Sequence, residues 1–201
     1  MKANKIIPVR EQIADVLRSD IISGELEPTT KLNEQQLAER FGVSRGPIRD
    51  VLLKLTKEGL LVSKNNIGSS VSSPLSADMQ KLNIEIRRKI EEYAVKHLAS
   101  LFTEADYDAL DEIIAKMQEH FDREEFTELT KTDIDFHKYY VEKAGGEDLL
   151  NMWYPIVLRM RMNYQRIKTS QALVDEHKDI VLALRNNDTK AAINAIRKNI
   201  K

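Results

Sequence analysis

Residues 32–62 limit the possible folds more than any other part of this 201-residue chain. Apolar residues recur there at helical spacing in two short stretches, which only Gly42 and Val43 separate. Glycine gives the backbone freedom that a sharp turn needs, and valine can fill the corner between two helices. Asn33, with Gln36 three residues later, is a suitable N-cap for the first helix. The pattern predicts a helix-turn-helix.

The start of the second helix carries residues with a distinct chemistry. Ser44 is a suitable N-cap, and Pro47 falls in the first turn, where a missing N–H costs little. Arg45 and Arg49 are four residues apart, so they share the outward face at this end of the helix. A recognition helix inserts this end into the DNA major groove, where an arginine can donate two hydrogen bonds to one guanine. The Ser44 end of the helix also suits a phosphate group.

The flanking sequence completes a small domain. Residues 8–23 have helical spacing, with Pro8 near the start and Gly24 just past the end. The expected apolar stripe of this helix consists of Val9, Ile13, Val16, Leu17 and Ile21. After the helix pair, two short strand-like stretches surround the turn Asn65-Asn66-Ile67-Gly68. Residues 1–73 therefore predict a winged helix-turn-helix DNA-binding domain with three helices and a β-hairpin wing.

The second part of the chain is patterned only for helices. Ser73-Pro74 marks the boundary, because proline biases the residue before it away from helix. Thr103 and Asp188 are expected N-caps, and Pro155 predicts a kink. The first expected helix begins at Ser76 or Asp78 and runs to residue 102, and the others cover residues 103–121, 126–144, 147–167, 171–185 and 188–201. Residues 76–201 therefore predict an all-α helical bundle, and the chain as a whole is mainly α with two domains.

Composition narrows the class of protein. The chain has no cysteine, which fits a reducing compartment, and no apolar run long enough to span a membrane. Its first residues lack the apolar segment typical of a signal peptide. We expect a cytoplasmic protein with no membrane partner. The formal net charge is −1, and residues 1–73 carry only 11 Lys and Arg against 9 Asp and Glu. DNA contact must therefore come from a local basic face.

The first domain resembles the winged helix-turn-helix of the GntR family of transcription regulators. The matching motifs are Leu37-Ala38, Gly42-Val43-Ser44-Arg45, Pro47, Arg49 and Glu58-Gly59-Leu60. The resemblance implies operator contacts from Ser44, Arg45, Arg49, Asn65, Asn66 and Gly68. At two further positions of this surface the chain departs from the family pattern: Gln35 replaces an arginine and Gly46 replaces a threonine. Without the motif, two arginines at helical spacing would indicate only a solvated face.

The second domain resembles the FCD domain of the FadR subgroup, in its shorter VanR-like form with six helices. The matching patches are Glu85-Ile86-Arg87 with Ile90-Glu91, Asp133-Ile134-Asp135-Phe136-His137, Glu176-His177-Lys178-Asp179-Ile180, and Ala191-Ala192. The resemblance implies an effector-binding and dimerisation domain. His97 and His120 lie outside these patches, and we expect them at the surface or as satisfied core groups.

A metal site is one implication of this resemblance. Asp133 and His137 are four residues apart and share a helix face, so both can bind one ion, and His177 comes from another helix. The implied ion is a divalent transition metal, Zn or Ni. Metal-binding relatives carry a third histidine at the position of Asn199, and an amide oxygen is a weaker ligand for these ions. The sequence leaves metal binding open.

The resemblance also implies an effector pocket. Arg87 matches the family's arginine that faces the ligand cavity. Helical phase likewise places Arg87 on the inward face of its helix and Arg88 toward solvent. An arginine inside a helical cavity needs an anion, which indicates a small carboxylate effector. Further lining residues are expected at Asn199 and Tyr164. Trp153, Tyr154, Met160 and Met162 either join them or form plain core.

Three functions follow from these features. The favoured one is a homodimeric, ligand-responsive repressor that binds a palindromic operator in double-stranded DNA, without enzymatic activity. The alternative is a metal-dependent hydrolase that uses Asp133 and His137 to hold an ion, but the sequence shows no general base at a fitting spacing. A non-specific architectural DNA protein is disfavoured, because such binding needs many basic contacts.

Overall fold

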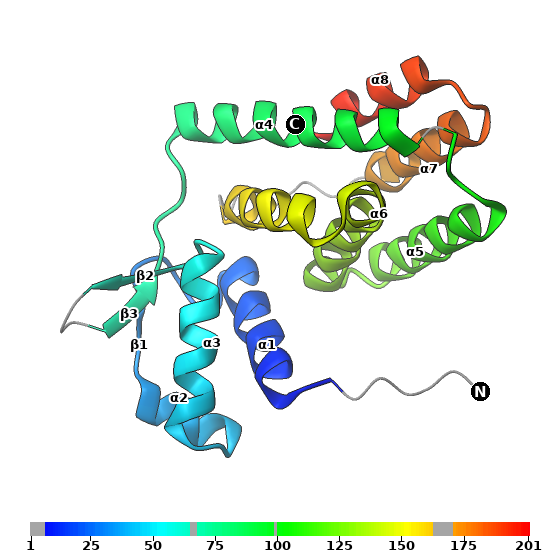
Figure 1. The fold of residues 1–201 in the computed structure, drawn as a ribbon. Helices are drawn as coiled ribbons and strands as arrows, with labels where there is room; N and C mark the ends of the chain where they lie inside the picture. The colour runs from blue at the N-terminus through cyan, green and yellow to red at the C-terminus, as the bar shows by residue number, and fades with distance from the viewer. Residues whose placement is uncertain (1–6, 65–67, 99, 163–170) are drawn as a thin grey trace. The chain divides into compact units, whose positions relative to one another are not determined.

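The computed structural model describes residues 7–64, 68–98, 100–162 and 171–201 (Figure 1). The chain divides into two compact units, the first up to Leu75 and the second covering most of the chain from Ser76 onward. In the ranges that the structure describes, no helix is both long enough and apolar enough to cross a membrane.

The first unit is a winged helix-turn-helix, as predicted. Its elements are α1 (Val9–Ser23), β1 (Lys31–Leu32), α2 (Glu34–Phe41), α3 (Arg45–Lys57), β2 (Leu61–Lys64) and β3 (Gly68–Val71). The strands form an antiparallel sheet in the order β1-β3-β2, with Val62 opposite Ser70. β1 lies in a polar connector where the sequence predicted no strand, because two residues are too short to show an alternating pattern.

Local interactions explain the turn between α2 and α3. The Asn33 side chain accepts hydrogen bonds from the backbone N–H groups of Gln35 and Gln36, which confirms the expected cap. Gly42 ends α2 with φ +64, a left-handed conformation that glycine adopts without strain. Ser44 occupies the N-cap position of α3 with an extended backbone. Within the described chain, however, its side chain makes no capping hydrogen bond.

The core of this unit lies between α1 and α3. Ile13, Leu17, Ile21, Ile48 and Leu55 are buried there. The prediction that Val9 and Val16 belong to the buried stripe of α1 is wrong, because Val9 is 54% exposed and Val16 is 39% exposed. The buried face is centred on Leu17, Ile21 and the fully buried Ala14, so Val9 in the first turn and Val16 on the flank fall outside it.

A buried ion pair joins α1 to the end of α3. Arg18 donates from Nε and Nη2 to the two carboxylate oxygens of Glu58, each at 2.7 Å, and both residues are buried. Glu58 directly follows α3 and precedes Gly59, which turns the chain into the wing. The bidentate Arg18–Glu58 pair fixes the orientation of the chain where it leaves α3 and enters the wing.

We expect Glu58→Ala to lower the free energy of unfolding by about 3–5 kcal/mol, because it removes the buried, bidentate partner of the Arg18 guanidinium and leaves the exposed Asp15 as a poorer substitute. Asp50→Ala is the matched control, since it breaks the exposed Arg10–Asp50 pair and should cost at most about 1 kcal/mol. Equilibrium unfolding in urea measures both values. Equal losses in the two variants would contradict the structural role of Glu58.

The described residues of the second unit form only helices, as expected for an all-α bundle. They are α4 (Ala77–Leu98), α5 (Glu104–Asp122), α6 (Phe126–Arg161), α7 (Gln171–Arg185) and α8 (Thr189–Asn199). The Asp188 side chain caps α8 by accepting from the Ala191 N–H at 2.9 Å. The predicted end of the fourth helix, near residue 167, lies outside the described residues.

α6 contains an interruption at a glycine pair. Gly145 and Gly146 have non-helical dihedral angles and divide α6 into two helical segments, where the sequence predicts a stop. A Cβ on Gly145 would lie 2.6 Å from the Leu149 Cβ, and Gly146 has φ +58, so both positions favour glycine. Pro155 keeps helical dihedral angles, so the break in the backbone falls at the glycines and not at the proline.

Asp106 fastens the start of α5 to α6. One of its carboxylate oxygens accepts from the Thr103 N–H at 2.8 Å, which completes the capping box, and the other accepts from Tyr139 at 2.7 Å and Lys143 at 2.8 Å. Burial disfavours the carboxylate, but hydrogen bonds from Lys143 and Thr103 outweigh it and hold the pKa of Asp106 well below its usual range.

This depressed pKa predicts a pH dependence of stability. The contribution of Asp106 is complete above the unfolded-state pKa of about 3.9 and is lost as pH falls through the lower folded-state pKa. The free energy of unfolding of the natural chain should therefore exceed that of Asp106→Asn at pH 6, and the difference should shrink between pH 4 and pH 2. Denaturant unfolding at several pH values tests this. A difference that stays constant would show that Asp106 is not stabilised as a carboxylate.

Candidate functional site

The predicted DNA-contacting arginines lie at the exposed start of α3. The side chains of Arg45 and Arg49 are 54% and 58% exposed. Both donate to a single oxygen of Glu34, at 2.9 Å and 2.8 Å respectively. The guanidinium groups therefore face solvent, and the first residue of α2 holds them close to each other.

The other residues predicted for this surface are placed as follows. Ser44, Gly46 and Gln35 are exposed, and Gln35 donates to Glu39 at 2.8 Å. A Cβ on Gly46 would meet no described atom within 4 Å, so the threonine usual in the family would fit here. Gly68 is exposed at the start of β3, whereas Asn65 and Asn66 lie outside the described residues.

Asp133, His137 and His177 come together inside the second unit. Asp133 and His137 come from the first segment of α6, and His177 comes from α7. All three are buried, and each offers one ligand atom such that these atoms lie within 4.8 Å of one another. Asp133 and His137 share one face of α6 because they are four residues apart, and packing of α7 brings the distant His177 next to that face.

The hydrogen bonds around the two rings determine which nitrogen is free. The Nδ1 of His177 lies 2.7 Å from the Leu173 carbonyl oxygen, which can only accept, so this nitrogen carries the proton. The Nδ1 of His137 lies 2.7 Å from the Glu91 carboxylate. Burial lowers the pKa of His137 and favours the neutral ring. Neither Nε2 atom has a hydrogen-bond partner among the described side chains.

This arrangement fits a divalent metal ion. The Nε2 of His177 lies 3.3 Å from an oxygen of Asp133, so an unprotonated nitrogen faces a carboxylate oxygen, and a cation bound by both atoms would relieve their repulsion. Histidine ligands of metals usually donate their other N–H to a carboxylate or a backbone carbonyl, and both arrangements occur here. The donor set of two nitrogens and one oxygen suits Zn or Ni.

Glu91 is the partner that orients His137. It is fully buried and accepts from Arg87 and Trp153, each at 2.7 Å, as well as from His137 and Tyr140. Burial opposes its charge, but Arg87 and His137 outweigh it and hold its pKa well below the usual range. The sequence analysis includes Glu91 only as part of a matching motif and assigns it no role. Its spacing of four residues from Arg87 on the same helix was the signal that could have predicted their ion pair.

Arg87 points into this cluster, as the sequence predicts. The prediction that Arg88 faces solvent is wrong. Arg87 is 3% exposed, and its Nη2 has no hydrogen-bond partner within the described part of the chain. Arg88 is half-buried and donates to the carbonyl oxygens of Arg197 at 2.9 Å and Ile200 at 3.0 Å. The last carbonyls of α8 lack partners within the helix and attract a cation, which explains the difference.

The remaining predicted pocket residues give a mixed result. Asn199 is half-buried, and its Nδ2 has no hydrogen-bond partner among the residues that the structure covers. Trp153 is fully buried and donates into the cluster through Glu91, and Met160 is buried. Tyr164 lies outside the described residues.

The cluster contains two buried carboxylates. Arg87 pairs with Glu91 at 2.7 Å, and Asp133 lies beside the two histidines. A divalent cation at Asp133 would add positive charge and make the cluster more attractive to an anion. The unpartnered Nη2 of Arg87 is a donor suited to that anion.

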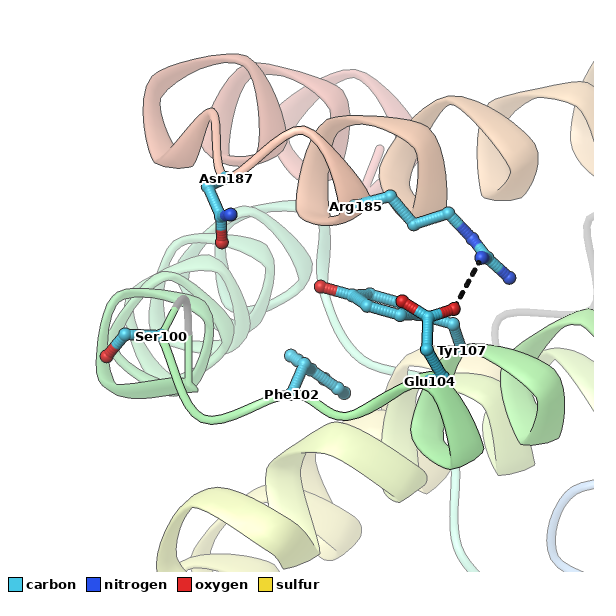
Figure 2. A pocket seen from close by; sticks show the side chains of 6 residues that line it. All are labelled: Ser100, Phe102, Glu104, Tyr107, Arg185 and Asn187. Atoms are coloured by element: carbon cyan, nitrogen blue, oxygen red, sulfur yellow. Dashed lines mark hydrogen bonds and ion pairs between the residues drawn. The ribbon is translucent and has the colours of Figure 1, made fainter.

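A separate concavity of about 530 Å³ lies at the surface of the second unit (Figure 2). Its lining includes Phe102, Tyr107 and Arg185. Figure 2 shows Arg185 reaching over Tyr107 to pair with Glu104, at 3.2 Å, and Arg185 also pairs with Asp111 at 2.7 Å. Because this arginine is already neutralised, we assign no ligand here.

Comparison with known proteins matches both parts of the chain to described families. Residues 9–71 match the bacterial regulatory proteins of the gntR family, and residues 83–201 match the FCD domain. The chain belongs to the GntR family, in its FCD subgroup. It is a DNA-binding transcription regulator by family, and nothing in the comparisons supports the hydrolase alternative.

The relatives and solved structures agree with this assignment. The chain is 28% identical to the HTH-type transcriptional repressor RspR of Escherichia coli, covering 98% of this chain and 88% of that protein. It is 24% identical to the gluconate operon transcriptional repressor of Bacillus licheniformis, covering 94% and 80%. The fold is similar to that of E. coli McbR/YncC, with a TM-score of 0.79 at 18% identity, over 97% and 94% of the two chains.

Proposed function

We propose that this GntR-family regulator is a repressor that binds a palindromic operator as a homodimer and responds to a small carboxylate in its C-terminal unit. The observation that carries the DNA-binding part is the exposure of Arg45 and Arg49 at the N-terminal end of α3. Each guanidinium can donate two parallel hydrogen bonds to guanine in the major groove. Ser44, with no capping role for its side chain, is available for a phosphate.

An exposed apolar face of α4 supports the homodimer. Its members are Met79 (46% exposed), Leu82 (45%), Ile86 (38%) and Tyr93 (53%). Their spacing places them on one side of the helix, away from the buried side that carries Arg87 and Glu91. A second copy can cover this face by the same contacts in reverse, which matches the two-fold symmetry of a palindromic site.

The effector site in this proposal consists of the buried cluster. Asp133, His137 and His177 would hold a Zn or Ni ion, and Arg87 would donate to a carboxylate of the effector. The bound ion supplies a Lewis acid and a positive charge at this point. Glu91 keeps His137 oriented through Nδ1, and Asn199 offers a further N–H donor. An effector that prefers one packing of the bundle would thereby change the affinity for the operator.

Arg45→Ala should weaken binding to the operator by about 1–3 kcal/mol, because a bidentate base contact is lost. Fluorescence anisotropy measures this with a duplex selected from a random pool by the natural chain. Arg123→Ala is the control, since it removes an exposed arginine of the second unit. Unchanged affinity in Arg45→Ala would exclude Arg45 from the DNA-contacting surface.

The double variant His137→Ala/His177→Ala should lose bound metal, because both nitrogen ligands are removed. Elemental analysis after incubation with Zn²⁺ and desalting measures the retained ion. The variant His97→Ala/His120→Ala removes the other two histidines and should retain as much zinc as the natural chain. Equal zinc in both double variants, or none in the natural chain, would contradict the metal site. Circular dichroism confirms that each variant is folded.

A further inference from the structure

Glu34 has a position that the DNA-binding proposal does not explain. It is the first residue of α2, and its Oε2 accepts from Arg45 and Arg49 of α3, at 2.9 Å and 2.8 Å. The Glu34 side chain is 29% exposed and both arginines are more than half exposed. Exposed ion pairs contribute little to stability. The helices already pack through buried residues such as Leu37 and Ile48, so the carboxylate is not needed to join them.

We propose that Glu34 is a specificity-determining residue, which holds Arg45 and Arg49 in one arrangement and suppresses binding to DNA of arbitrary sequence. This inference rests on the proposed DNA-binding function. It assigns Glu34 a positioning role, in which the carboxylate acts through the two arginines and makes no contact with a base itself.

The geometry leaves the arginines able to bind DNA. Each guanidinium has five N–H donors, and the described contact with Glu34 uses Nη2 of Arg45 and Nε of Arg49. The Nη1–Nη2 edge of Arg49 is thus not engaged by Glu34. A long arginine side chain loses rotamer freedom when it binds a base, and a side chain already held in place loses less. Glu34 therefore favours the one register in which both arginines meet their bases.

The charge of Glu34 has a second consequence. Its pKa is held below the usual range by hydrogen bonds from Arg45 and Arg49, so the carboxylate is ionised at neutral pH. It reduces the positive charge at this end of α3. Non-specific binding depends on cations that neutralise phosphates and release counterions, so a fixed anion between two cations weakens it for every sequence. Specific binding is weakened less, because the arginines are pre-positioned for their bases.

The test compares two glutamine variants of the full chain. Glu34→Gln keeps the shape and removes the charge between the arginines. Glu39→Gln is the matched control, because Glu39 lies on the same helix, is exposed, and bonds Gln35 rather than an arginine of α3. Anisotropy titrations at several salt concentrations measure the affinity for a duplex selected by the natural chain and for a scrambled duplex of equal composition.

We expect Glu34→Gln to lower the ratio of selected to scrambled affinity about tenfold, mainly through tighter binding to the scrambled duplex. The slope of log affinity against log salt for the scrambled duplex should steepen by up to about one. Glu39→Gln should leave the ratio unchanged.

Three results would overturn the inference. One is an unchanged ratio in Glu34→Gln, and another is an equal loss in Glu39→Gln, which would make the effect one of net charge alone. The third is relaxed preference at a single base pair with unchanged scrambled affinity, which would show that Glu34 contacts a base, such as a cytosine amino group. If the natural chain itself shows no preference for the selected duplex, the proposed function fails, and not the role of Glu34 alone.

Discussion

The second unit depends on one buried carboxylate, that of Glu91. A charge removed from water must find hydrogen-bond donors inside the protein, and Glu91 finds them on α4 and on both segments of α6. These donors can reach it only if the glycine break in α6 turns the second segment so that Trp153 approaches from another direction than His137. The same contacts fix the ring of His137, whose Nε2 has no hydrogen-bond partner among the described residues, within the cluster that also holds Asp133 and His177. The hydrogen bonds that stabilise the buried Glu91 carboxylate thus also orient His137 in the candidate metal centre.

The two units use the same chemistry in opposite settings. Arg87 and Glu91 are buried, so their pairing decides protonation states and orientation in the low-dielectric interior. Arg45, Arg49 and Glu34 are solvated, so their pairing adds little stability and instead sets how charge is presented to a partner. An incoming nucleic acid meets cations that are already restrained, whereas an incoming effector meets a donor, Arg87 Nη2, that has no described partner.

Features that short stretches of chain determine were predictable from the sequence. Asn33 and Asp188 cap their helices as expected, and Gly145-Gly146 interrupts α6, because caps and glycine breaks act over a few residues. Contacts between distant elements were not predictable. The pairing of Glu34 with both arginines and the bonds from Arg88 to the end of α8 depend on how helices pack. The cluster of Asp133, His137 and His177 was accessible only because the family resemblance joined two separate helices.

The tautomers of His137 and His177 in the metal-free chain test this account most directly. Long-range ¹H–¹⁵N correlation spectra at neutral pH distinguish a protonated from an unprotonated ring nitrogen, and with four histidines in the chain single variants can assign each ring. We expect both rings to carry the proton on Nδ1 and to have an unprotonated Nε2. A proton on Nε2 of His177, bonded to Asp133, or on Nε2 of His137 would contradict it, because the cluster would then be satisfied without an ion.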